Sequence, residues 1–345
     1  MKEYVWNLSD LEKVQKNGYK VFSCFSCGGG SCMGYKLAGY EIIGNCEIDK
    51  KINDMYLSNF KVKYNFCMRI QDLIYQDLPK ELYDIDILDG SPPCSTFSTN
   101  GKREKDWGKE KYFREGQEKQ VLSDLFFDFI RIAEKLKPKI VVAENVKGLI
   151  LGNAKGYVNL IIKEFDKIGY EVQIFLLNAA NMGVPQKRER IFFICRRKDL
   201  NLPEIKLSFN EKPILYKEFK DSNYTPMNKD TLEYKRWLKR KPTDLSIGDI
   251  VKRTENGKIS CFSHKIIKDN QTPLTQTAGD PFIRYDVPGF ISEKDIKTIQ
   301  SFPQDYNFRG QNASYVCGMS VPPLMIKKIA VEIQKQLLDK IGELK

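Results

Sequence analysis

The sequence predicts an α/β protein with a mostly parallel sheet and a second, smaller domain. Its first half alternates short β-rich runs with helical runs, which is typical of parallel strands covered by helices on both faces. Between residues 199 and 270 clear periodicity disappears, and Lys, Asn, Pro and Tyr become frequent. We therefore predict a main domain from residues 1–198 plus 271–345, and a separate small domain from residues 199–270.

The individual elements follow from apolar spacing. Strands are predicted, in chain order, at 19–25, 41–46, 85–88, 139–143, 172–177 and 191–195. Apolar residues at 121, 122, 125, 126, 129, 132, 133 and 136 form one helical stripe, which Lys137-Pro138 ends. Further helices are predicted at 157–168, 291–302 and 321–338, and we expect the last of these to pack back on the main domain.

Bulk composition narrows the class of protein. The 345 residues are 41% hydrophobic and 29% charged, which is ordinary for a globular protein with ample core. No apolar run of about 18 residues and no apolar leader at 1–10 are present, so we expect a cytoplasmic protein without a membrane span. Nine cysteines without paired spacing and a single histidine make a structural metal site improbable.

Positive charge is concentrated rather than spread along the chain. The net charge is +11, and residues 196–268 carry 18 Lys and Arg against 10 Asp and Glu. A local excess of this kind favours a polyanionic partner. A solvated lysine-rich surface would give the same count, so charge alone does not decide between the two interpretations.

A glycine-rich turn follows the first predicted strand at 25–30 (FSCGGG). Such glycines let a ligand approach the backbone, and the following helix N-terminus favours an acidic group. About 20 residues further on, Glu47 closes the next strand, where an acid accepts ribose hydroxyls in nucleotide-binding folds. The combination indicates a nucleoside cofactor, whereas a glycine turn alone is often only structural.

The most informative segment is 89–94 (DGSPPC), at the end of a predicted strand. Active-site residues of open α/β sheets lie at such strand ends. A free cysteine is often core filler, but Cys94 follows two stiffening prolines and precedes a Lys-rich loop that could close over a phosphate backbone. We interpret Cys94 as a candidate active-site residue rather than core filler.

Together these segments resemble the DNA (cytosine-5) methyltransferase family of bacterial or phage type. Further segments match its motifs in order: 143–146 (AENV) resembles E-N-V, 186–190 (QKRER) resembles Q-x-R-x-R, 299–303 (IQSFP) resembles L-Q-x-F-P, and 318–323 (GMSVPP) resembles G-N-x-V-P-P. The resemblance covers roughly 19–198 and 271–338, and it implies a Rossmann-like S-adenosylmethionine-dependent sheet with a smaller target-recognition domain.

The resemblance implies a set of catalytic roles. Cys94 would attack C6 of a cytosine that has left the helix stack, and Glu144 would protonate or hydrogen-bond N3. Arg190 and Arg188 would stabilise O2 and hold the carboxylate, and Asn145 would support the site. An independent argument agrees. A cysteine needs a neighbouring positive field to be a thiolate at neutral pH, and Arg188 and Arg190 could supply that field. A buried Glu144–Arg190 ion pair without catalytic function is the alternative interpretation.

Ligand contacts are implied in the same way. S-adenosyl-L-methionine would be bound by Phe25, Gly28, Gly30, Glu47, Ile48, Asp72 (at the adenine amino group), Leu73, Pro93, Leu125, Ser320 and Val321. Double-stranded DNA would be bound by Ser98, Lys102, Arg103, Gln186, Lys235, Arg236, Lys239 and Arg240. The basic run 234–241 could equally be a solvated helix. We expect a monomer without an obligate protein partner, and a cognate restriction endonuclease is compatible with the family.

Some positions depart from the family pattern. Ser23 occupies a place often held by Asp, Cys27 replaces a usual Gly, and Ser95 stands where many members have Gln. Met319 replaces the usual Asn of the closing motif beside the cofactor, so we expect weaker or slower use of S-adenosylmethionine.

Three rival functions stay open on the sequence alone. An RNA cytosine-5 methyltransferase would share the scaffold, although the sizeable basic insert favours duplex DNA. A non-catalytic DNA-binding protein would not need Cys94, Glu144 and both arginines. An NAD-dependent oxidoreductase would share the glycine turn and Glu47, but it would explain neither the Pro-Pro-Cys segment nor the arginine pair.

Overall fold

The computed structural model describes residues 2–93, 110–111, 120–121, 124–151, 155–255, 263–279 and 281–341. Four residues predicted to act on DNA or on the base, Cys94, Ser98, Lys102 and Arg103, lie outside this part of the chain. Within the described residues no helix is long and apolar enough to cross a membrane.

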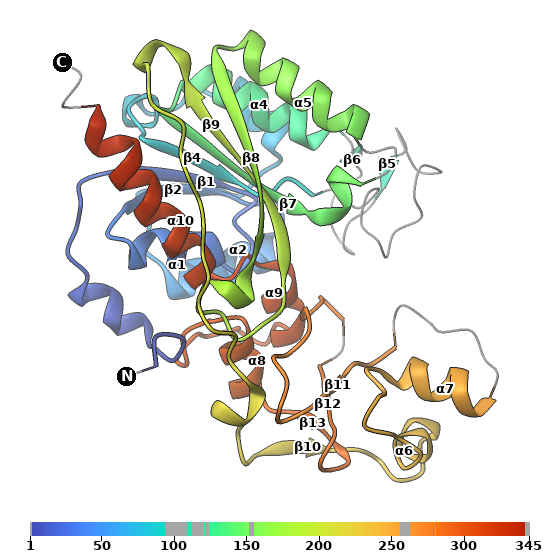
Figure 1. Ribbon diagram of the computed structural model, residues 1–345. Helices are drawn as coiled ribbons and strands as arrows, with labels where there is room; N and C mark the ends of the chain where they lie inside the picture. Colours follow the sequence, from blue (N-terminus) through green and yellow to red (C-terminus); the bar gives the residue numbers. More distant parts are fainter. Residues whose placement is uncertain are drawn as a thin grey trace.

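A seven-stranded sheet organises the main domain, in the order β3-β2-β1-β4-β7-β9-β8 (Figure 1). Its strands are β1 (Lys20–Cys24), β2 (Glu41–Cys46), β3 (Tyr64–Phe66), β4 (Ile87–Gly90), β7 (Ile140–Val146), β8 (Tyr170–Asn178) and β9 (Glu189–Arg197). Neighbouring strands from β3 to β7 pair in parallel, and β9 lies antiparallel between β7 and β8. The prediction of a mostly parallel sheet is confirmed, and the short β3 is an addition to it.

Helices cover both faces of this sheet because successive strand residues point in opposite directions. On one face Val21, Ile42 and Val142 pack with α1 (Gly30–Leu37), α2 (Lys50–Asn59) and α10 (Pro323–Gln336). On the other face Phe22, Ile43 and Val141 pack with α3 (Ile70–Tyr75), α4 (Leu125–Leu136) and α5 (Lys155–Lys167). The two apolar layers hold the strand ends rigidly.

The predicted helices are found within a few residues of their expected bounds, and the start of one helix differs most. The helix expected from residue 121 begins at Leu125, because Gln120–Val121 forms strand β6, paired with β5 (Glu110–Lys111). The predicted helices at 291–302 and 321–338 correspond to α8 (Glu293–Ile299) and α10, and α9 (Ala313–Met319) lies between them. Short 3₁₀ turns occupy Leu8–Lys13, Lys80–Tyr83, Lys147–Ile150, Ala179–Asn181, Lys198–Leu200, Tyr216–Glu218 and Leu338–Lys340.

The second domain is a small four-stranded sheet in the order β10-β13-β12-β11 with two helices beside it (Figure 1). Its elements are β10 (Tyr224–Pro226), α6 (Leu232–Trp237), α7 (Ile247–Glu255), β11 (Ile266–Ile267), β12 (Ile283–Arg284) and β13 (Gly289–Ile291). A separate apolar cluster around Trp237, Ile250 and Ile283 fills it.

The bounds of this domain differ from the predicted 199–270 at both ends. Strands β12 and β13 follow residue 270 and still belong to the small sheet. At the other end Ile205 exchanges hydrogen bonds with Gln173 of β8, and Tyr216 is fully buried in the main core. Strand pairs between distant segments leave no local periodicity, so the sequence does not show where such a domain closes.

Helices α1 and α10 approach closely at Gly34. A Cβ atom on Gly34 would lie 2.5 Å from Ile326 Cβ and 2.5 Å from the carbonyl oxygen of Pro323. The carbonyl is backbone and cannot rotate away, so glycine is required for this contact.

We predict that Gly34→Ala lowers the free energy of unfolding by about 1–3 kcal/mol through overpacking. Gly156→Ala on α5 is the matched control, because nothing lies within 4 Å of that position and alanine favours the helix. Urea denaturation of the two variants measures the difference. Equal destabilisation of both would contradict this account of the α1–α10 contact.

Candidate active site

The centre of the site is an ion pair between Glu144 and Arg190 on neighbouring strands. Arg190, the second residue of β9, pairs with Val146, the last residue of β7, so the Arg190 and Glu144 side chains emerge near the same strand end. Arg190 Nε lies 2.9 Å from Glu144 Oε1, and the side chains are only 14% and 11% exposed. Burial lowers the pKa of Arg190 from its usual value, while the Glu144 carboxylate opposes that shift. The pair therefore places an acid and a guanidinium side by side in a largely buried position.

Asn145 joins this pair to the segment that leads to Cys94. Its amide donates to the carbonyl of Pro92 at 3.0 Å, and its side-chain oxygen accepts the backbone N–H of Val146 at 2.9 Å. The end of β7 thereby anchors the chain two residues before Cys94. The predicted supporting role of Asn145 has this contact as its structural counterpart.

Arg188 does not lie where the sequence predicts it. It is 2% exposed, and its two terminal nitrogens donate to the main-chain carbonyls of Gln276, Gly318 and Ser320 at 2.9–3.0 Å. The resemblance implies a guanidinium turned toward the substrate beside Arg190. Instead these donors join β9 to the chain returning from the second domain and to the end of α9, because buried carbonyls need partners.

Gln186 is also a correction, since the resemblance places it on the DNA surface. It is fully buried, and its amide donates to the Ile299 carbonyl and to Gln300 Oε1 at 3.1 and 2.7 Å. Its oxygen accepts the backbone N–H of Gln276 at 2.8 Å. With both ends of the amide engaged inside the protein, Gln186 braces the same junction as Arg188.

A cavity opens at the carboxyl ends of β1, β2 and β4, and it encloses about 790 Å³ when the solvent-filled space at its mouth is counted. Five of the predicted cofactor residues line it, namely Phe25, Glu47, Ile48, Pro93 and Leu125. Its wall also includes Cys27, Cys46, Asp49, Ile52, Met68, Arg69, Ile70, Ser91, Tyr315 and Met319. Met319, the departure noted in the closing motif, thus lies on the cavity wall.

In the part of the chain that the structure describes, Glu47 is one of two acidic residues on the cavity wall, the other being Asp49. The two carboxylate oxygens of Glu47 accept the backbone N–H groups of Cys27 and Asp49 at 2.9 and 3.0 Å. Burial raises the pKa of Glu47, and these hydrogen bonds oppose the rise. Each carboxylate oxygen keeps a further lone pair, so the group can accept ribose hydroxyls while the apolar walls contact a base. A carboxylate acceptor together with apolar walls fits S-adenosylmethionine.

Six predicted cofactor residues do not line this cavity. Gly28 and Gly30 instead pack against Val316, Ser320 and the Val321 carbonyl, where a Cβ would lie 2.1–2.5 Å from its nearest neighbour. Leu73 is fully buried in the core. Ser320 and Val321 are buried behind the glycine-rich turn.

Asp72 is not itself on the cavity wall but lies beside it, next to Arg69. Its carboxylate holds the guanidinium of Arg69 through two hydrogen bonds of 2.8 and 2.9 Å. Arg69 and Ile70, which the sequence does not reveal as candidates, occupy the wall at the end of β3. Both residues follow the strand Tyr64–Phe66. This strand has only three residues, too few to show alternation, so no local pattern marks the segment.

The basic candidates in α6 and the three residues after it divide into two kinds. Lys235 and Lys239 are exposed. Arg236 instead forms a two-pronged pair with Glu255, at 2.9 and 2.7 Å. Arg240 stacks 3.3 Å above the Trp237 ring and donates to the Tyr285 carbonyl, so it serves the core of the small domain.

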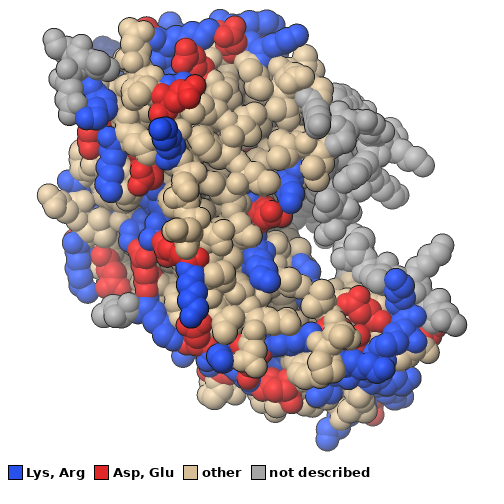
Figure 2. All heavy atoms as spheres, viewed as in Figure 1, with Lys and Arg blue, Asp and Glu red and all other residues tan. Residues whose placement is uncertain are grey.

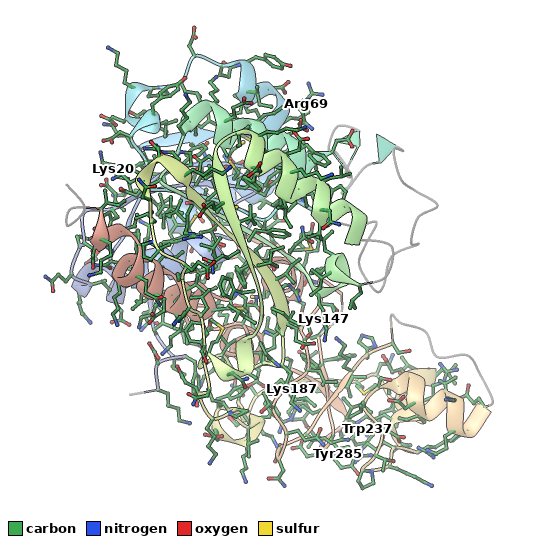
Figure 3. All side chains as sticks on the ribbon, turned by 45° about the horizontal axis from the view of Figure 1, so that its top comes forward. Lys20, Arg69, Lys147, Lys187, Trp237 and Tyr285 are labelled. Carbon is green, nitrogen blue, oxygen red and sulfur yellow. The ribbon has the colours of Figure 1, made fainter. Side chains whose placement is uncertain are left out.

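Space between the two domains is visible as a hollow in the molecular surface (Figure 2). Lys and Arg side chains gather on the small domain below it. Lys187 lies between the domains, whereas Trp237 and Tyr285 lie within the smaller one (Figure 3). Lys187 is exposed, and its backbone binds Pro273 and Thr275 of the returning chain.

Comparisons with known proteins agree with this geometry. A family model described as C-5 cytosine-specific DNA methylase matches residues 19–335. The Type II methyltransferase M.NgoPII of Neisseria gonorrhoeae is 30% identical over 348 residues, covering 93% of this chain and 97% of that protein. M.FnuDI of Fusobacterium nucleatum is 38% identical over 201 residues, covering 58% of this chain and 53% of that relative.

One solved structure extends the likeness to the whole fold. An E. coli prophage protein described as a DNA modification methyltransferase superposes with a TM-score of 0.66 at 19% identity, covering 93% of this chain and all of that one. At that identity the likeness bears on the fold alone. The family match over most of the sequence, on the Rossmann-like sheet described above, establishes that this chain belongs to the C-5 cytosine-specific DNA methylases.

Proposed function

We propose that this protein transfers a methyl group to C5 of a cytosine in a specific sequence of double-stranded DNA, with Cys94 as the nucleophile. The observation that carries the proposal is the enclosed Glu144–Arg190 pair, whose neighbour Asn145 anchors the chain two residues before Cys94. A stacked base cannot reach such a site, so the target cytosine has to leave the helix.

The protein groups divide the reaction between them. The Cys94 thiolate adds to C6, while Glu144 holds or protonates N3 and Arg190 binds O2, so negative charge from the attack is neutralised. C5 then becomes nucleophilic. After methylation a base removes the C5 proton, the C6–sulfur bond breaks, and the thiolate leaves. Arg188 supports this arrangement from behind, because its terminal donors are bound to main-chain carbonyls.

S-adenosyl-L-methionine, when bound, supplies the methyl group. Glu47 would hold its ribose hydroxyls, and Phe25, Ile48 and Leu125 would contact its base, as the cavity wall suggests. Met319 offers no hydrogen-bonding amide at its place on this wall. We therefore keep the expectation of weaker cofactor affinity than an Asn at this position would give.

The basic surface of the small domain supports duplex DNA as the substrate. Lys and Arg side chains gather on this domain below the hollow, and Lys187 lies between the two domains (Figures 2 and 3). Phosphate contacts of this kind fix register on a duplex, and groove contacts read its sequence. We propose a cytoplasmic monomer, and both a cognate restriction endonuclease and an independent role are compatible with it.

Covalent trapping tests the nucleophile. A pool of duplexes carrying 5-fluorocytosine should form a denaturant-stable adduct with the enzyme and cofactor, because fluorine on C5 cannot leave as the proton does. Cys94→Ser should give no adduct, and Glu144→Gln should slow trapping by about 10²–10⁴-fold, the usual range for general acid–base catalysis. Bisulfite sequencing of DNA from expressing cells identifies the target. A wild-type enzyme that methylates ordinary cytosine without ever trapping would refute the covalent step.

The two arginines should respond differently to replacement by lysine. Arg188→Lys loses hydrogen bonds between a charged group and buried carbonyls, so we expect the free energy of unfolding to fall by roughly 3 kcal/mol. Arg190→Lys keeps a cation beside Glu144 but lacks the planar guanidinium, so stability should change little while the methylation rate falls. Urea denaturation and initial rates separate the two effects. An Arg188→Lys variant as stable as wild type would show that the carbonyl contacts contribute nothing.

The exposed lysines in α6 and just after it should control the salt dependence of DNA binding. Replacing Lys235 and Lys239 by alanine should lower the slope of log affinity against log salt by about 1 for every phosphate that is no longer neutralised. Lys20→Ala is the control, because Lys20 begins β1 away from the small domain (Figure 3). Fluorescence anisotropy at several salt concentrations measures the slopes. An unchanged slope in the double variant would place the DNA elsewhere.

A further inference from the structure

The interior of the large sheet contains a carboxylate that the proposed reaction does not use. Asp89 on β4 is 3% exposed and lies directly opposite Ser23 of β1 in the strand register. The Ser23 hydroxyl donates to Asp89 at 2.9 Å, and the Tyr35 hydroxyl of α1 donates at 3.3 Å. The Ser31 hydroxyl, in the first turn of α1, is a further hydrogen-bond partner. A buried carboxylate is costly, so this placement calls for a reason.

These partners stand on both sides of the glycine-rich turn. Strand β1 enters the turn from Ser23, and α1 leaves it through Ser31 and Tyr35. Phe25, Cys27 and Gly29 within the turn all have positive φ values, of 56°, 43° and 74°. Such backbone persists only where its surroundings over-determine it. Asp89 ties the two ends of this strained turn together from a neighbouring strand.

The same carboxylate is connected to the rest of the site through β4. One residue beyond Gly90, the end of that strand, Ser91 and then Pro93 line the cavity, and Cys94 follows. On the turn itself Phe25 and Cys27 also line the cavity. The hydrogen bond from Ser23 to Asp89 therefore links the strand that leads to Phe25 and Cys27 with the strand that leads to Ser91 and Pro93.

We propose that Asp89 is a positioning residue that holds the glycine-rich turn in its cofactor-binding shape through the hydroxyls of Ser23 and Tyr35. The inference rests on the proposed function of the cavity. It also accounts for Ser23, which stands where the DNA (cytosine-5) methyltransferase family often has Asp. In this protein the carboxylate lies on the neighbouring strand instead, at Asp89, the residue paired with Ser23.

The charge of Asp89 changes near neutral pH. Burial raises the pKa of Asp89 to about 7, and the nearby Glu144 of β7 adds to the rise, while the hydroxyl donors oppose it. The other titratable groups that face it are Cys24 on β1, Cys32 and Tyr35 on α1, and Tyr56 on α2. Burial raises the pKa of each of these well above neutrality, so they stay uncharged. The carboxylate of Asp89 therefore changes its charge at about pH 7, whereas these cysteines and tyrosines do not.

Exchanging the residues at positions 23 and 89 between the two paired strands tests the proposal. We expect Asp89→Ser to weaken equilibrium binding of S-adenosylhomocysteine by roughly tenfold or more, the order expected when hydrogen bonds to a charged group are removed. Ser23→Asp should also weaken binding, because it places two carboxylates side by side. The double variant S23D/D89S restores one carboxylate to the registered pair, and its affinity should return to within about threefold of wild type, the usual uncertainty of such contributions.

The isosteric variant Asp89→Asn distinguishes a loss of positioning from a loss of folding. Its melting temperature and near-ultraviolet dichroism establish that it folds. Wild-type affinity should fall as pH drops through about 7, where the hydroxyls lose their anionic acceptor, and the Asn variant should lack this component. Its KM for cofactor should rise while kcat at saturating cofactor stays nearly constant.

Two outcomes would overturn the inference. One is a folded Asp89→Asn protein that binds cofactor as tightly as wild type with the same pH profile. The other is a double exchange that binds no better than its single variants. Failure of the proposed function would look different, because the wild-type protein itself would then neither bind S-adenosylhomocysteine nor methylate DNA.

Discussion

The carboxyl ends of parallel strands meet along one edge of the large sheet, and every candidate functional group depends on that constraint. The glycine-rich turn follows β1, Glu47 follows β2, the Pro-Pro-Cys segment follows β4, and Glu144 lies near the end of β7. Parallel pairing brings these ends side by side although they are far apart in the sequence. Antiparallel β9 then delivers Arg190 to the same edge from the opposite direction. A cofactor cavity and an acid–guanidinium pair can therefore share one rim.

Buried polar groups hold this rim in place from behind. Arg188 and Gln186 bind carbonyls and amides of the chain that returns from the second domain, and Asn145 binds the carbonyl of Pro92. Each such group would be costly in an apolar core unless its partners were well placed. The network thus links the orientation of the small domain to the geometry of the site. A shift of either domain would leave buried donors without acceptors, which opposes loose movement at this junction.

Much of this arrangement could be predicted from the sequence, because local signals carried it. Alternating apolar runs predicted most strands of the large sheet, and the glycine turn with Glu47 predicted a nucleoside cavity that Phe25, Ile48 and Leu125 do line. Side-chain direction could not be predicted in the same way. Gln186 and Arg188 are buried and face inward. Both make their hydrogen bonds with groups far along the chain, whose position the local sequence does not fix.

The sequence by itself determined the fold class, the order of the motifs and the residue types that the chemistry needs, because apolar periodicity and turn chemistry are properties of short segments. Only the tertiary structure decided which polar groups line the cavity and which face the core. It placed Arg190 rather than Arg188 beside Glu144, extended the small sheet to β12 and β13, and brought Asp89 opposite Ser23. The physical reason is that burial and hydrogen-bond pairing are set by segments distant in the chain, whose mutual register no local pattern encodes.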